Sequence, residues 1–260
     1  MRIPYYQVNA FTNRTFGGNP AGVCLLNGWL PEPLLQEIAT ENNFAETAFL
    51  CKGSRGYDLR WFTPKLEVDL CGHATLASAA VLFFEREEKG EVVEFTTRSG
   101  ILTARRNGDL LELDFPSRPA SACAYPTLTE LVRAGIPATE VLKSRDVLAV
   151  FEREEEVARL SPDMDLVAKF DCLGLIATAP GKGSDFVSRF FAPRAGVPED
   201  PVTGSAHSTL IPYWADRLKK QKLYARQISL RGGELFCELR GDRVGIAGHT
   251  VCYCRGEIQV

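Results

Sequence analysis

The sequence is short of the features that mark membrane, secreted and metal-binding proteins. No run approaches the roughly 20 consecutive apolar residues that a membrane helix needs, and the first residues lack the apolar stretch of a signal peptide. The three histidines have no metal-ligand spacing, and the eight cysteines contain no CxxC pair. We therefore expect a cytoplasmic protein with no membrane contact, no metal centre and no disulfide framework.

The chain also lacks a charge excess of either sign. Its 30 basic and 33 acidic residues give a formal net charge of −3, so electrostatics makes no case for a nucleic-acid partner. A hydrophobic fraction of 45% and a charged fraction of 24% are typical of a globular protein. At 260 residues, the chain is long enough for two domains.

What the sequence does contain is a duplication. The stretches 59–84 and 187–214 each read as an apolar strand that ends in an aromatic residue, a small residue and proline, followed by a loop and a glycine that opens a helix. Equivalent pairs are Pro64 and Pro193, Gly72 and Gly204, and Gly100 and Gly233, at offsets of 129, 132 and 133 residues. Agreement at so many positions in one order predicts two similar halves.

The halves are predicted to divide within a segment rich in proline, serine and alanine, 116–126. We expect half-domains at 1–116 and 117–260, with central helices near 73–85 and 204–218 and room for the last residues to pack on the first half. The first of these helices is apolar all round and too short to span a membrane, so it should be buried in protein. Many short strands around one buried helix per half predict an α+β fold in which a barrel-like sheet wraps a central helix.

Both predicted helices begin with glycine and small or polar residues, CGHAT at 71–75 and TGSAH at 203–207. A helix start offers unpaired N–H groups and a partial positive charge, which suit a carboxylate or phosphate. Glycine and serine are also simply good residues for starting a helix. Because the pattern occurs twice, we favour two helix starts that converge on one small anionic ligand in a cleft between the halves.

Three side chains near these starts are candidates for proton chemistry. Glu46 shares one face of a predicted strand with Phe44 and Ala48; it is either a buried carboxylate suited to proton transfer or an edge-strand residue that points to water. Asp200 is either an N-cap before a proline or a second acid or base. His73 directly precedes the helix and is placed to donate to an anion or to shuttle a proton.

Cys71 allows a rival mechanism. A racemase with two thiols would need a cysteine at the equivalent position of the second half, where the sequence has Thr203. The sequence therefore argues against a symmetric two-cysteine mechanism, and a racemase or epimerase with one thiol base at Cys71 remains an alternative. The other alternative is a binding protein, for a small molecule or another protein, that keeps the fold without turnover.

Four blocks of the sequence resemble the signature blocks of the PhzF-type phenazine biosynthesis isomerases, and in particular those of the phenazine biosynthesis-like domain-containing proteins. These blocks are NAFTNRTFGGNPAGVCLL, ENNFAETAFL, LRWFTPKLEVDLCGHATLASA and RFFAPRAGVPEDPVTGSAH. The resemblance runs from residue 7 to beyond 245. It implies a diaminopimelate epimerase-like fold with two pseudosymmetric halves, an isomerase that needs no cofactor, a small carboxylate-bearing substrate and a homodimer. It also implies roles for residues by position: Glu46, His73 and Asp200 in catalysis, and Asn19, Gly72, Gly204 and Ser205 in substrate binding. The sequence departs from the family pattern at Ala45, where serine is common.

Overall fold

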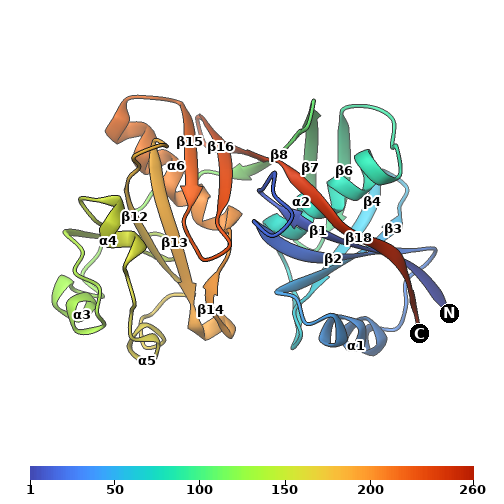
Figure 1. The fold of residues 1–260 in the computed structure, drawn as a ribbon, viewed down its shortest axis with the longest axis horizontal. Coiled ribbons are helices and arrows are strands. Elements are labelled where there is room, and N and C mark those ends of the chain that lie inside the picture. The colour runs from blue at the N-terminus through green and yellow to red at the C-terminus, as the bar shows by residue number, and fades with distance from the viewer. The chain divides into compact units, whose positions relative to one another are not determined.

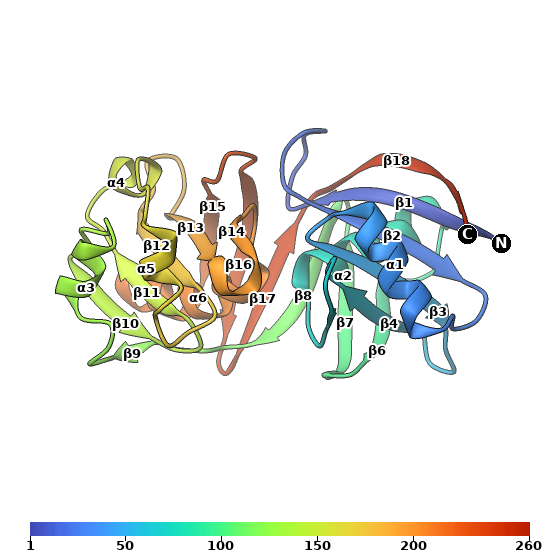
Figure 2. The same ribbon diagram turned by 90° about the horizontal axis from the view of Figure 1, so that it is seen from below.

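The computed structural model describes residues 1–260, and they form two compact units (Figure 1). Unit 1 comprises Met1–Asp114 together with Ala247–Val260, and unit 2 comprises Phe115–Ile246. The last strand of the chain therefore belongs to the same unit as the first. In Figure 2 the last strand runs beside the first one. The two strands are antiparallel, so the N- and C-termini lie at the same end of this strand pair.

Unit 1 is built on a mixed sheet. Its strands are β1 (Arg2–Ala10), β2 (Asn19–Leu26), β3 (Glu46–Lys52), β4 (Tyr57–Phe62), β5 (Glu67–Val68), β6 (Val92–Thr97), β7 (Gly100–Asn107), β8 (Leu110–Pro116) and β18 (Thr250–Gln259). They pair in the order β18–β1–β2–β3–β4–β6–β7–β8, with β5 also on β4. The β2–β3 and β4–β6 pairs are parallel and the others are antiparallel.

The helix α2 (Gly72–Ala80) lies inside this sheet, and one π-helical turn, η1 (Val81–Glu85), continues it. It contacts β1, β2 and β3, and also β7 and β18, which stand far apart in the pairing order. The sheet therefore curls around the helix. Every residue of α2 after its first glycine is buried, and its alanines favour a helix while letting the strands approach closely. This confirms the buried helix that the apolar sequence predicted.

A second helix of unit 1, α1 (Glu32–Asn42), covers the outside of the sheet. Its first turn contains proline, and Asn43 ends it in the left-handed conformation with φ 52°. Leu35 and Ile38 pack in one apolar cluster with Phe49 and Phe62. The buried side of α1 therefore packs on the sheet through this cluster.

Unit 2 repeats the plan. Its strands are β9 (Ser121–Ala122), β10 (Glu140–Lys143), β11 (Val147–Val150), β12 (Leu175–Pro180), β13 (Phe186–Ala192), β14 (Val197–Asp200), β15 (Lys222–Gln227), β16 (Gly233–Arg240) and β17 (Arg243–Gly248). The pairing order is β9–β10–β11–β12–β13–β15–β16, with β14 also on β13. The parallel pairs β11–β12 and β13–β15 match β2–β3 and β4–β6 of unit 1, so the duplication seen in the sequence is also a duplication of topology.

The central helix of unit 2 is α6 (Gly204–Leu218), which contacts β15 and β16. Its Trp214 is buried; the indole stacks on Phe186 of β13 with ring centroids 5.7 Å apart, and its Nε1 donates to Thr178 Oγ1 of β12 at 2.9 Å. These contacts bind the helix to the inner face of the sheet. Shorter helices border the unit: α3 (Leu128–Arg133), α4 (Glu154–Ala158), α5 (Met164–Val167) and the 3₁₀ turn η2 (Pro193–Ala195).

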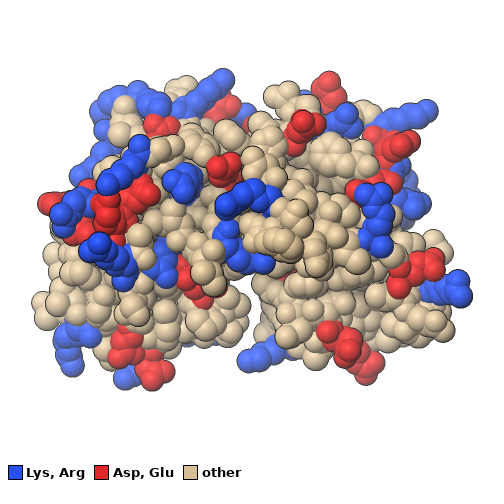
Figure 3. Space-filling model, in the orientation of Figure 1, with Lys and Arg blue, Asp and Glu red and all other residues tan.

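The surface agrees with the balanced charge of the sequence. In the face drawn in Figure 3, basic and acidic side chains are interspersed, and many of them lie close to a partner of opposite sign. None of the helices has the length and apolar character required to cross a membrane.

Candidate active site

The strand β3 and the helix α2 bring Glu46 and His73 together. Glu46 is the first residue of β3, beside Ala21 of β2, and its side chain is 19% exposed. His73 is the second residue of α2 and its side chain is 6% exposed. The His73 Nε2 and Glu46 Oε2 atoms are 3.3 Å apart. The edge-strand alternative for Glu46 is wrong, because β3 lies between β2 and β4.

His73 is an uncharged imidazole at neutral pH. Burial removes water from the ring and lowers the pKa of His73 from 6.5 to about 3. Its buried Nε2 has no well-aligned hydrogen-bond partner in the structure, although Glu46 Oε2 is close enough to become one. Such contacts are often loose before substrate binds. A neutral ring carries one proton, so one nitrogen donates and the other accepts.

Cys71 stands on the other side of the same ring, with its Sγ 3.5 Å from His73 Nδ1. Single ligand atoms of Glu46, Cys71 and His73 lie within 4.8 Å of one another, which raises the question of a metal site. The thiol faces Nδ1 whereas the carboxylate faces Nε2. Two partners on opposite nitrogens suit a hydrogen-bonded chain through the ring better than three ligands around one ion.

The start of α2 leaves its first backbone N–H groups without a side-chain cap. Cys71 is the N-cap residue in an extended conformation, and no side chain caps the helix there. Its carbonyl accepts from the Thr75 amide at 3.2 Å and from the Thr75 hydroxyl at 2.5 Å, which fixes the backbone at this point. Gly72 begins the helix. Asn19 is the buried first residue of β2. It lies two residues before Ala21, which pairs with Glu46, so it is close to Glu46 along the sheet.

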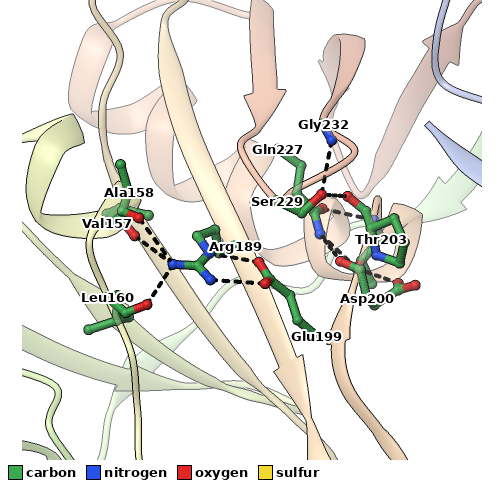
Figure 4. A network of polar contacts seen from close by, with 11 residues as sticks. Val157, Ala158, Leu160, Arg189, Glu199, Asp200, Thr203, Gln227, Ser229 and Gly232 are labelled. Carbon is green, nitrogen blue, oxygen red and sulfur yellow. Dashed lines mark hydrogen bonds and ion pairs between the residues drawn. The ribbon is translucent and has the colours of Figure 1, made fainter. Parts of the chain in front are cut away.

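In unit 2 one of the two alternatives for Asp200, the N-cap, is wrong. The helix α6 begins at Gly204 with Thr203 as its N-cap, and Asp200 ends β14 instead. The proline that follows Asp200 lies in the loop between β14 and α6, so it does not open the helix. The Thr203 hydroxyl donates to Asp200 Oδ2 at 2.5 Å, and Gln227 Nε2 donates to the Asp200 carbonyl at 2.8 Å (Figure 4).

The strand that carries Asp200 is held by an ion pair next to it. Arg189 of β13 donates through Nε and Nη2 to the two carboxylate oxygens of Glu199, at 2.6 and 2.9 Å. Its Nη1 donates to the Leu160 carbonyl at 2.7 Å (Figure 4). This bidentate contact fixes the end of β14 and with it the position of the Asp200 backbone.

Gly204 and Ser205 open α6, whose start also lacks a side-chain cap. The Ser205 hydroxyl accepts from Arg145 Nη2 at 3.0 Å. Arg145 lies in the turn between β10 and β11, where buried Asp146 accepts from its Nη2 at 2.8 Å and from its Nε at 3.1 Å. A guanidinium, paired with Asp146, therefore stands beside the helix start.

The histidine of α6 has a different environment from that of α2. His207 Nδ1 lies 2.8 Å from the Thr203 carbonyl, which can only accept, so the ring proton is on Nδ1. Burial lowers the pKa of His207 to about 4, against a smaller opposing effect of this hydrogen bond. Its ring packs 5.9 Å from the Phe186 ring in the core of unit 2. His207 is therefore a structural residue.

The structure thus groups Glu46, His73 and Gly72, with Asn19 nearby, in unit 1, and it groups Asp200, Gly204 and Ser205 in unit 2. Their catalytic and binding roles stay predictions. Sequence reasoning missed Arg145, which is 60 residues from Ser205 in the chain and belongs to no motif.

Comparison with known proteins places these residues in a family. The family described as phenazine biosynthesis-like protein matches residues 8–256. The chain belongs to the phenazine biosynthesis-like family. An uncharacterized isomerase of Pseudomonas aeruginosa is 51% identical to it over 100% of both chains, and the phenazine biosynthesis-like domain-containing protein of Homo sapiens is 41% identical over 99% of both. Several relatives that match over the whole chain are isomerases by name, and this family member is likewise an enzyme of the isomerase type.

Solved structures agree with the family and define the fold. A PhzF family protein of Enterococcus faecalis superposes with a TM-score of 0.97 at 45% identity, over 100% of both chains. A hydroxyproline epimerase from Agrobacterium vitis superposes with a TM-score of 0.61 at 11% identity, over 99% of this chain and 92% of that one, which shows a shared fold. The predicted fold class is confirmed: α+β, diaminopimelate epimerase-like, with a curled sheet around a central helix in each half.

Proposed function

We propose that this phenazine biosynthesis-like protein is a cofactor-independent isomerase in which Glu46 moves a proton between two carbons of a small carboxylate-bearing substrate. The observation that carries the proposal is the carboxylate of Glu46 beside the buried, uncharged His73, at 3.3 Å. A neutral imidazole can donate a hydrogen bond to a carboxylate without forming an ion pair that would hold it permanently ionised. Glu46 can therefore accept a proton and release it again during a cycle.

The proposed step balances without a redox partner. A carbon–hydrogen bond of the substrate breaks, its proton forms an O–H bond with Glu46, and the electron pair stays on the substrate, spread into an adjacent carbonyl or double bond. The O–H bond then breaks and the proton forms a new bond at another carbon. Glu46 ends as the carboxylate with which it began, so one residue serves as base and then as acid.

Two helix starts support the choice of an anionic substrate. Those of α2 and α6 both lack side-chain caps, and backbone N–H groups at a helix start bind carboxylates. At the second start, the guanidinium of Arg145, which is paired with Asp146, stands beside Ser205 and offers N–H donors. We assign Asn19, Gly72, Gly204 and Ser205 to substrate binding and Asp200 to proton exchange or orientation on this basis.

Deuterium incorporation from heavy water tests the proposal. A panel of small amino and hydroxy acids with an activated C–H bond is incubated with the protein, and the label is read by mass spectrometry and NMR. We expect at least one acid to gain deuterium, and Glu46→Gln to slow this by roughly 10²- to 10⁴-fold. Glu41→Gln, an exposed glutamate on α1, is the matched control and should exchange like the wild type. Exchange that persists in Glu46→Gln would contradict the assignment of Glu46.

A thiol mechanism is the second candidate, favoured by the position of Cys71 at the start of α2, 3.5 Å from an imidazole nitrogen. In a racemase with one thiol base, Cys71→Ser would abolish exchange because a hydroxyl is a far weaker base than a thiolate, and Glu46→Gln would retain it. The glutamate mechanism predicts the reverse. Measuring both variants on one substrate separates the two candidates.

A further inference from the structure

Cys71, His73 and Glu46 form a chain of contacts that the proton-transfer step does not itself require. The Cys71 sulfur is 3.5 Å from one nitrogen of the imidazole, and the Glu46 carboxylate oxygen is 3.3 Å from the other. All three side chains belong to unit 1. The cysteine is 7% exposed, and its backbone is fixed by the two hydrogen bonds from Thr75 to its carbonyl.

Only two arrangements of protons satisfy this chain. In the first, the thiol donates to Nδ1, so the ring proton is on Nε2 and faces Glu46, which accepts as a carboxylate. In the second, the ring proton is on Nδ1 and faces sulfur, a weak acceptor, and Glu46 must be protonated to donate to Nε2. The first arrangement is favoured because the Glu46 carboxylate accepts from an N–H donor and the thiol donates to a nitrogen lone pair, whereas in the second the sulfur must act as a weak acceptor. It also leaves Glu46 in the form that can accept a proton.

We propose that the Cys71 thiol donates to Nδ1 of His73 and so fixes the ring with its proton on Nε2, facing Glu46. Cys71 is then a positioning residue that acts through His73. This inference rests on the proposed function, since it assigns the group that prepares Glu46 as a base. It differs from a thiol mechanism because Cys71 exchanges no proton with the substrate.

A fixed ring limits the paths open to the transferred proton. With Nδ1 occupied by the thiol and Nε2 already protonated, the uncharged ring has no free lone pair. It cannot take the proton that Glu46 removes from the substrate. The proton therefore returns from Glu46 to the substrate or exchanges directly with water, and His73 is a hydrogen-bond donor in the cycle and does not act as a shuttle.

The two ring nitrogens can be distinguished by ¹⁵N NMR of the histidine side chains in the resting protein. His207 is an internal reference, because the Thr203 carbonyl fixes its proton on Nδ1. We expect His73 to show the opposite pattern, with a protonated Nε2 and an unprotonated Nδ1. A His73 ring with its proton on Nδ1 in the wild type would overturn the proposal, whether or not a substrate is known.

Variants of Cys71 test the cause. Cys71→Ser replaces the thiol with a hydroxyl donor and should keep the Nε2-protonated form, whereas Cys71→Ala removes the donor and should give a mixture of both forms. For deuterium exchange we expect Cys71→Ser to stay near the wild-type rate and Cys71→Ala to fall by roughly two- to tenfold, the loss of one hydrogen bond. If the ring signals of Cys71→Ala match the wild type, Cys71 does not fix the ring. That result would leave the Glu46 mechanism intact, because loss of exchange in Glu46→Gln tests it separately.

Discussion

His73 Nε2 lies 3.3 Å from Glu46 Oε2, although the two residues are 27 positions apart in the chain and belong to a helix and a strand. The contact exists because the curled sheet of unit 1 places the first residue of β3 at the start of α2. It joins the two side chains of unit 1 that the sequence selected for proton chemistry. For activity, the position of the N–H donor that faces Glu46 should therefore matter more than the aromatic character of the His73 ring.

We expect His73→Gln to retain more activity than His73→Asn. A glutamine amide can place an N–H near the position of the imidazole Nε2, whereas the shorter asparagine places it near Nδ1, away from Glu46. A hydrogen bond to a charged group contributes about 1.5–3 kcal/mol, so His73→Asn should slow deuterium exchange by roughly ten- to a hundredfold. Equal rates for the two variants would show that the donor to Glu46 is unimportant.

Stability should fall as the pH drops below about 6.5. Burial lowers the pKa values of His73 to about 3 and of His207 to about 4, so between these values and the unfolded pKa of about 6.5 the unfolded chain binds more protons. Their stabilising contribution is complete above that window and is lost as the pH falls through it, by about 2 kcal/mol per histidine between pH 7 and pH 5.

Urea denaturation at pH 5, 6 and 7 measures this dependence. His207→Asn keeps a donor for the Thr203 carbonyl and removes the titrating ring, so its free energy of unfolding should change less with pH than that of the wild type. His249→Asn, a partly exposed histidine, is the control and should follow the wild-type curve. A pH dependence that is identical in all three proteins would contradict this account.

The sequence predicted those features that depend on local pattern. The α2 helix could be recognised as buried because alanine, leucine and valine cover all of its faces, and the duplication could be recognised because both halves keep the order of strand, proline, loop and glycine. In each case, the information lies within a few neighbouring residues.

The sequence could not predict contacts that depend on how strands pair. Asp200 precedes a proline, a pattern that resembles a helix start. Asp200 is nevertheless the last residue of strand β14, because it pairs with Phe190 of β13. Arg145 reaches Ser205 only because the β10–β11 turn lies beside the start of α6. The orientation of Cys71 toward His73 depends on the N-cap conformation of one residue, which the sequence leaves open among several.

Thr178→Val should destabilise the fold by about 1–3 kcal/mol. The substitution keeps the size of the side chain and removes the oxygen that accepts from the buried Trp214 Nε1 and that donates to the Val187 carbonyl at 2.7 Å. The cost arises mainly from the buried Trp214 indole N–H, which loses its acceptor. Thr103→Val, on a strand of unit 1 and only partly buried, is the control and should change the free energy of unfolding by less than about 0.5 kcal/mol in urea titrations. Similar effects at both sites would show that the Trp214 contact contributes little.

Arg145→Ala should weaken the binding of carboxylate substrates. Asp146 holds the guanidinium in place and Ser205 accepts a hydrogen bond from it, so its charge is fixed at the start of α6. A charged hydrogen bond to the substrate carboxylate would contribute about 1.5–3 kcal/mol, which corresponds to roughly a ten- to hundredfold rise in KM for deuterium exchange.

Arg145→Lys separates charge from geometry, because lysine keeps the charge but loses the planar fork that contacts Asp146 and Ser205 together, and it should give an intermediate KM. Arg133→Ala, an exposed arginine on α3, is the matched control and should leave KM unchanged. If Arg145→Ala lowered kcat and left KM unaltered, Arg145 would stabilise charge that develops during proton transfer and would not be a ground-state anchor. Measuring both constants for one labelled acid therefore decides what the guanidinium contributes.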